Sequence, residues 1–181
     1  MIKGMIIKPI VLVGMMGSGK STVGKKLARK LNLQFYDSDK VLEEREGLNI
    51  VDIHEFMGPK YFQQIEEETI KEIIDYGTVI LSTGGSSFMN ENIRQMIKEK
   101  AVSVWLDVDC ETIYERVSRR NTRPELMAIG NKKELLMKMI EERRPIFESA
   151  DIKVESALEA HHLVETIAKR IEKYFAEDGS Q

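Results

Sequence analysis

The stretch Gly14-Met15-Met16-Gly17-Ser18-Gly19-Lys20-Ser21 decides the fold. It has the spacing G-x-x-x-x-G-K-[ST], in which glycines let the backbone curl until its N–H groups converge on phosphate oxygens. The apolar run Ile10–Val13 precedes this stretch, as expected for a strand that is covered on both faces. Val23, Leu27 and Leu31 follow it at the four-residue spacing of a helix face. The order strand, glycine loop, helix predicts a phosphate-binding loop.

The residue types in this loop match the chemistry of a bound triphosphate. A helix that starts near Lys20 points its dipole and its unpaired N–H groups at the anion. Lys20 supplies a mobile positive charge for the β- and γ-phosphates, and Ser21 offers a hydroxyl to Mg2+. The alternative is a chance match in a glycine turn before a helix. Met15 and Met16 are interpreted as packing residues.

Short β-rich runs alternate with helical patterns along the rest of the chain. Further strands are expected at 33–36, 78–82, 102–106 and 152–154. Helices are expected at 41–46, 50–57, from 60 to just before Gly77, 91–100, 111–120, from 133 to 143 before Pro145, and around 163–174. This alternation predicts an α/β fold built from parallel βαβ units, with ligands beyond the carboxyl ends of the strands.

Composition excludes several classes of protein. Lys and Arg number 27 against 30 Asp and Glu, a net charge of −3, which disfavours a nucleic-acid partner. A single cysteine excludes an intramolecular disulfide framework and a cysteine-built zinc site. The early apolar stretch Ile10–Met16 has seven residues, whereas a membrane helix needs about 20. We therefore expect a cytoplasmic protein with no membrane partner, and we expect a monomer.

Two further features follow expected strands. Asp37 and Asp39 come after the second strand, where one carboxylate could reach Mg2+ through water and the other could position an attacking hydroxyl. The alternative is a polar turn in which Asp39 caps the next helix. Thr83-Gly84-Gly85-Ser86 ends the third strand, and its paired glycines allow either close approach to a ligand or a tight turn. Glu66-Glu67-Glu68 is interpreted as a solvated helix face.

The order of these motifs resembles the shikimate kinase family over roughly residues 10–154. The resemblance adds Arg123-Pro124 in a polar segment and Arg143-Arg144-Pro145 after the next helix. It implies a three-layer P-loop kinase fold with a five-stranded parallel sheet of order 2-3-1-4-5. It also implies ATP-dependent phosphorylation of the 3-hydroxyl of shikimate to shikimate 3-phosphate and ADP, with Mg2+, on the route to chorismate and the aromatic amino acids.

Carried over position by position, the resemblance implies a nucleotide site and a substrate site. The nucleotide site comprises Gly17, Ser18, Gly19, Lys20, Ser21, Thr22, Arg116 along the adenine, and Arg123 of a lid. Ser21 resembles the Mg2+ ligand, and Asp37 the carboxylate that contacts Mg2+ through water. The substrate site comprises Asp39, Gly84, Gly85 and Arg143, with Asp39 binding the hydroxyls and Arg143 the carboxylate. Lys20, Asp39 and Arg123 are the expected catalytic residues.

The family pattern also predicts the internal organisation of a single kinase domain over 1–181. The core spans about 8–36, 77–118 and 145–175, the substrate-binding lobe about 37–76, and the lid about 119–132.

Two positions depart from the family pattern. Gln63 stands where the family has an arginine that pairs with the later arginine on the substrate carboxylate, and Ser86 stands in place of a third glycine. Glutamine donates hydrogen bonds but has neither charge nor bidentate fork. Lys60, three residues earlier, is hypothesised to replace part of the missing charge. The open alternatives are a related small-molecule kinase with a different hydroxy-acid acceptor, and a nucleotide-binding homologue without catalysis.

Overall fold

The fold is a three-layer α/β structure around one parallel sheet. The computed structural model describes residues 6–119, 132–156 and 160–178. The strands are β1 (Ile10–Val13), β2 (Gln34–Asp37), β3 (Val79–Ser82), β4 (Val102–Asp107) and β5 (Ile152–Glu155). They pair in the order β2-β3-β1-β4-β5, and every pairing is parallel. This confirms the expected order 2-3-1-4-5.

Helices connect the strands in the alternating pattern that the sequence predicts. They are α1 (Lys20–Leu31), α2 (Ser38–Glu46), α3 (Ile50–Met57), α4 (Pro59–Asp75), α5 (Glu91–Lys100), α6 (Cys110–Ser118), α8 (Lys132–Phe147) and α9 (Ala160–Asp178). A short 3-10 turn, η2, covers Ser87–Met89. Among these helices of the described residues, none is long and apolar enough to cross a lipid bilayer.

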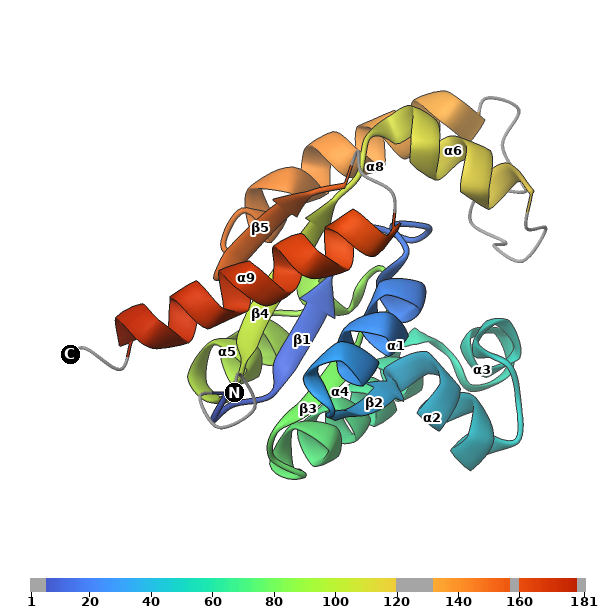
Figure 1. Ribbon diagram of the computed structural model, residues 1–181. Helices are drawn as coiled ribbons and strands as arrows, with labels where there is room; N and C mark the ends of the chain where they lie inside the picture. The colour runs from blue at the N-terminus through green and yellow to red at the C-terminus, as the bar shows by residue number, and fades with distance from the viewer. Residues whose placement is uncertain (1–5, 120–131, 157–159, 179–181) are drawn as a thin grey trace.

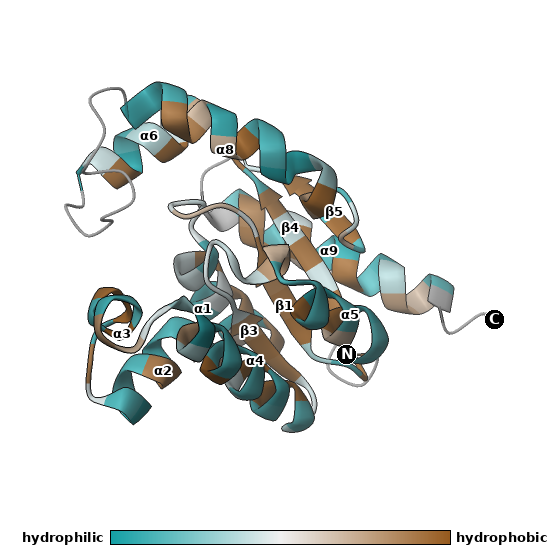
Figure 2. Cartoon of the chain, turned by 180° about the vertical axis from the view of Figure 1, so that it is seen from behind, coloured by the Kyte–Doolittle hydropathy of each residue, from teal (hydrophilic) through white to brown (hydrophobic). Residues whose placement is uncertain are grey.

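The alternation of side chains along the strands divides the core into two layers. In β1, Ile10 and Leu12 pack against α1 and α9, whereas Val11 and Val13 pack against α4, α5 and α8. Figure 1 shows these two sets of helices on opposite faces of the sheet. β1 is apolar along its whole length, and Figure 2 shows polar residues along the outer faces of the helices. A strand covered on both faces reads as a continuous apolar run, which is why Ile10–Val13 was identifiable.

A smaller apolar cluster holds α2, α3 and the first half of α4 together beside the sheet (Figure 1). Leu42, Ile53 and Ile65 form its buried centre, one from each helix. α3 is capped at its start by Asn49, whose side chain accepts from the Asp52 amide. This part of the chain carries Asp39 and Glu66 toward the carboxyl ends of β2 and β3.

The expectation that the helix before Pro145 ends at residue 143 is wrong. α8 continues through Pro145 to Phe147. Proline removes one backbone donor and crowds the preceding turn, which is tolerable so close to a helix end. The last turn is held by Phe147, whose ring stacks on Trp105 and lies parallel to that of Phe88. Arg143 therefore lies inside the helix, one turn from its end.

Candidate active site

The phosphate loop connects β1 to α1 at the carboxyl edge of the sheet. Gly14, Gly17 and Gly19 all have positive φ, at 144°, 73° and 91°, which side chains disfavour. A Cβ on Gly14 would also lie 2.9 Å from the Leu106 carbonyl oxygen. Gly19 precedes α1 and provides no side-chain cap, so no capping side chain competes with an anion at the start of this helix. The predicted phosphate loop is thus present in structure as well as in sequence.

Lys20 curls back over this loop. Its Nζ donates to the carbonyl oxygens of Gly14 at 2.8 Å and Met15 at 2.9 Å, and the residue is only 7% exposed. An ammonium held in a loop of converging amides concentrates positive potential at one point. Such a point charge suits the β- and γ-phosphates of a nucleotide.

Three oxygen-bearing side chains meet beside Lys20. The Ser21 hydroxyl donates to Asp37 Oδ2, and its Oγ lies 3.3 Å from Ser82 Oγ. Asp37 and Ser82 are register partners at the ends of β2 and β3. A hydroxyl and a carboxylate are the hard oxygen donors that Mg2+ accepts, with phosphate oxygens and water completing the shell. Ser21 and Asp37 therefore fit the predicted metal site.

Asp37, not Asp39, caps the helix that follows β2. The Asp37 carboxylate accepts from the Lys40 amide at 3.4 Å, whereas Asp39 lies in the first turn of α2. The alternative in which Asp39 is only a helix cap is therefore wrong. Asp39 instead faces Gly84, because a Cβ there would lie 3.0 Å from Asp39 Oδ1. The glycine turn and this carboxylate are in close contact, as the substrate assignment requires.

Glu66 is a site residue that the sequence interpretation missed. The residue is 6% exposed, and its Oε1 accepts a 2.5 Å hydrogen bond from the Ser87 hydroxyl. A Cβ on Gly84 would lie 3.4 Å from the same oxygen. The expectation of a solvated face is wrong for Glu66, because it lies four residues after Phe62 and four before Ile70. That spacing places it on the inward stripe of α4, which was the available signal.

Burial raises the pKa of Glu66 from 4.5 to about 7, chiefly because desolvation disfavours its charge. The hydrogen bond from Ser87 acts in the opposite direction, and the negative charges of Asp39 and Glu67 raise the pKa further. Asp39 is thus accompanied by a second carboxyl group that is partly protonated near neutral pH.

This raised pKa predicts a pH-dependent stability. Because the folded pKa lies above the unfolded value, the contribution of Glu66 to the free energy of unfolding is complete below pH 4.5 and is lost as the pH rises through 7. The difference in pKa corresponds to about 3 kcal/mol. We therefore measure the free energy of unfolding with urea for the wild type and for Glu66→Gln. Between pH 4.5 and about pH 8, the wild-type value should fall by about this amount relative to the variant. Glu68→Gln, at an exposed position of the same helix, is the control. If the difference in the free energy of unfolding between the wild type and Glu66→Gln did not change with pH, the raised pKa of Glu66 would be contradicted.

The second glycine of the turn lies against the phosphate loop. A Cβ on Gly85 would lie 2.8 Å from the Met16 amide nitrogen, so no side chain fits without displacing backbone. Arg143 approaches from α8, and its Nη1 donates to the Gly85 carbonyl oxygen and the Ser86 hydroxyl, both at 3.5 Å. Its neighbour Arg144 instead binds Asp107 at the end of β4. Arg143 therefore contacts the glycine turn, whereas Arg144 contacts the end of β4.

Arg116 lies at the opposite side of the phosphate loop. Its Nη1 donates to the Gly17 carbonyl oxygen at 3.1 Å. Val117, Arg119 and Ser156 lie beside it along the cavity wall, and none of them carried a recognisable sequence signal. Ser156 follows β5, and its amide donates to the Asp107 carbonyl oxygen at 2.8 Å.

A cavity of about 510 Å³ joins these groups. Of the sequence-predicted residues, it is lined by Gly17, Ser18, Gly19, Lys20, Ser21, Thr22, Asp37, Asp39, Gly84, Gly85 and Arg116. Arg143 borders it through the glycine turn. Gln63 is exposed on α4, one turn before Glu66, and is not among the residues that line the cavity. Arg123 lies outside the described residues.

Comparison with known proteins agrees with this geometry. The family model described as Shikimate kinase matches residues 16–175. A shikimate kinase of Bartonella quintana is 36% identical over 92% of this chain and 80% of its own, and one of Rhodopseudomonas palustris is 42% identical over 82% and 73%. The solved structure of a shikimate kinase from Acinetobacter baumannii in complex with shikimate is similar, with a TM-score of 0.85 at 29% identity, covering 98% of each chain. The chain therefore belongs to the shikimate kinase family.

Proposed function

We propose that this chain transfers the γ-phosphate of ATP to the 3-hydroxyl of shikimate, giving shikimate 3-phosphate and ADP. One observation carries the proposal: the phosphate loop and the pair Asp39–Gly84 line the same cavity. In-line phosphoryl transfer needs two reactants held close together and charge neutralisation more than covalent chemistry. Family membership supports shikimate as the acceptor.

In the proposed reaction, each group has one task. Asp39 accepts a hydrogen bond from the attacking hydroxyl and takes up its proton. Lys20 and the N–H groups at the start of α1 stabilise charge on the transferred phosphoryl group. Arg143 binds the carboxylate of the acid. Ser21 and Asp37 would hold Mg2+, which neutralises the β- and γ-phosphates when bound.

The remaining assignments rest on the family pattern. We propose a single kinase domain in which 37–76 is the substrate lobe, and the small cluster of Leu42, Ile53 and Ile65 supports this division. Arg123 is proposed as the arginine that closes the phosphate site, within a lid at about 119–132. The proposal includes a monomer that acts in the cytoplasm.

An acceptor panel tests the proposed function. ADP formation is measured with shikimate and with other polyols and hydroxy acids, each at saturating ATP and Mg2+. We expect saturable, shikimate-dependent turnover. Selective turnover of another hydroxy acid would favour the second candidate, a related small-molecule kinase. This candidate is considered because Gln63 stands where the family has an arginine. ATP binding without any acceptor-dependent turnover would indicate a non-catalytic homologue.

Restoring the family arginine should strengthen acid binding. Charged hydrogen bonds contribute about 1.5–3 kcal/mol, so Gln63→Arg is expected to lower the KM for shikimate about 10- to 100-fold without changing the KM for ATP. Gln64→Arg adds the same charge at the next exposed position and is the matched control. An unchanged KM in Gln63→Arg would show that this position does not face the acid. Lys60→Ala should raise the KM only if Lys60 supplies part of the missing charge.

A further inference from the structure

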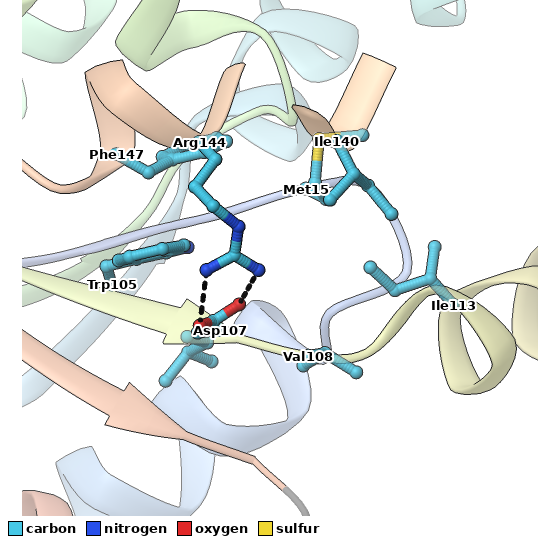
Figure 3. A pocket seen from close by; sticks show the side chains of 9 residues that line it. Met15, Trp105, Asp107, Val108, Ile113, Ile140, Arg144 and Phe147 are labelled. Carbon is cyan, nitrogen blue, oxygen red and sulfur yellow. Dashed lines mark hydrogen bonds and ion pairs between the residues drawn. The ribbon is translucent and has the colours of Figure 1, made fainter. Parts of the chain in front are cut away.

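Arg144 lies next to Arg143 in α8 but is directed toward the sheet. Its guanidinium donates to both carboxylate oxygens of Asp107, at 3.0 and 3.1 Å (Figure 3). It also lies over the ring of Trp105, 5.3 Å from the centroid. The Asp107 side chain is 13% exposed and the Arg144 side chain 39%, so the pair is shielded from water on the carboxylate side. A planar guanidinium held at two oxygens has a fixed position and a fixed orientation.

The same end of α8 contacts the phosphate loop. Figure 3 shows Met15, from the loop, beside Ile140 of α8 and close to Arg144. The space between these side chains is about 10 Å³, too small for an organic ligand, so this is a packed junction and not a second binding site. The ion pair thus holds the end of α8 to β4, and Ile140, one turn before Arg144, packs against Met15 of the loop that precedes Lys20.

The position of the Arg143 guanidinium depends on the contacts of α8 with β4 and the phosphate loop. Its Nη1 lies 3.5 Å from the Gly85 carbonyl oxygen and from the Ser86 hydroxyl, at the outer limit of a hydrogen bond. Consecutive helical residues project about 100° apart, so a rotation of α8 that released Arg144 from Asp107 would also move Arg143. We propose that the Arg144–Asp107 pair positions Arg143 for the carboxylate of the acid substrate. The inference rests on the proposed function, because it assigns the acid to Arg143.

Asp107 retains a second cation if Arg144 is removed. Lys153 Nζ lies 3.2 Å from Asp107 Oδ2 and 4.8 Å from the centroid of Trp105. Breaking a shielded pair normally leaves an uncompensated charge, which is strongly destabilising. Here Lys153 prevents that, so Arg144→Met is expected to fold and to bind ATP normally. Substitution of Asp107 would instead leave the cations of Arg144 and Lys153 over the Trp105 ring without their shared carboxylate. It is therefore the poorer test.

A double-mutant cycle separates positioning from a merely structural role. Steady-state kinetics are measured for the wild type, Arg144→Met, Arg143→Ala and the double variant. We expect Arg144→Met to raise the KM for shikimate about tenfold while the KM for ATP stays within about twofold. In the Arg143→Ala background, Arg144→Met should add less than about twofold, because the residue that it positions is already absent. Arg144→Lys, with one contact in place of two, should fall between wild type and Arg144→Met.

Lys138→Met is the matched control, since it breaks the exposed Lys138–Glu142 pair on the same helix. A multiplicative effect of the two arginine substitutions, or an unchanged KM for shikimate in Arg144→Met, would overturn the inference while leaving the proposed function intact. A wild-type enzyme without shikimate-dependent turnover would overturn both.

Discussion

Asp39→Asn is expected to lower kcat with shikimate by about 10²- to 10⁴-fold, the range for loss of a positioned general base. The amide keeps the shape of the carboxylate, and so its contact with Gly84, but it cannot take up the proton of the attacking hydroxyl. ATP binding should be unchanged, because the phosphate loop does not depend on Asp39. Stopped-flow or coupled ADP assays give kcat, and calorimetry gives the Kd for ATP.

Asp52→Asn is the matched control for this experiment. Asp52 lies in the same lobe, in the first turn of α3, where its carboxylate accepts from the Asn49 side chain. It should leave kcat within about twofold, since surface substitutions away from special features have small effects. If Asp39→Asn also retained wild-type kcat, Asp39 would not be the base.

Lys20→Ala is the second variant with a large expected effect. Removal of one charge-stabilising donor typically lowers kcat by about 10²- to 10³-fold, and here the ammonium also ties together the Gly14 and Met15 carbonyls. We therefore expect both a lower kcat and a weaker affinity for ATP, in contrast to Asp39→Asn. Kinetics at varied ATP and direct nucleotide titration measure the two losses separately.

The control for Lys20→Ala is Lys26→Ala, at an exposed position of α1. Both variants remove one positive charge from the same helix, but only Lys20 reaches the loop. Normal ATP affinity and normal kcat in Lys20→Ala would show that the loop binds phosphate through its backbone alone.

The features that the sequence predicted are local ones. Ile10–Val13 was recognisable because a strand buried on both faces is continuously apolar, and the loop after it because its glycines and Lys20 are adjacent in the chain. Glu91–Lys100 also agreed with its predicted bounds; Asn90 caps its first turn through the amides of Asn92 and Ile93. The strand order, by contrast, came from the family resemblance and not from periodicity.

The features that were missed depend on contacts between distant parts of the chain. Three consecutive glutamates predict a solvated face, yet Glu66 accepts a hydrogen bond from Ser87, 21 residues further along the chain. Arg143 and Arg144 have different partners because Arg144 binds Asp107, which lies 37 residues away in the chain. Pro145 predicts a helix end, because the packing of Phe147 on Trp105 is not visible in the local sequence. In each case a contact between residues that are distant in the chain overrides the structure that the local sequence pattern predicts.

The central claim is phosphorylation of the 3-hydroxyl of shikimate, and the product itself tests it most directly. The wild-type enzyme is incubated with shikimate, ATP and Mg2+, and the product is analysed by two-dimensional 31P–1H NMR. We predict one new phosphate-ester resonance that correlates with the proton on carbon 3, accumulating in step with ADP. A correlation with another ring proton, or inorganic phosphate as the only new phosphorus species besides ADP, would contradict the account.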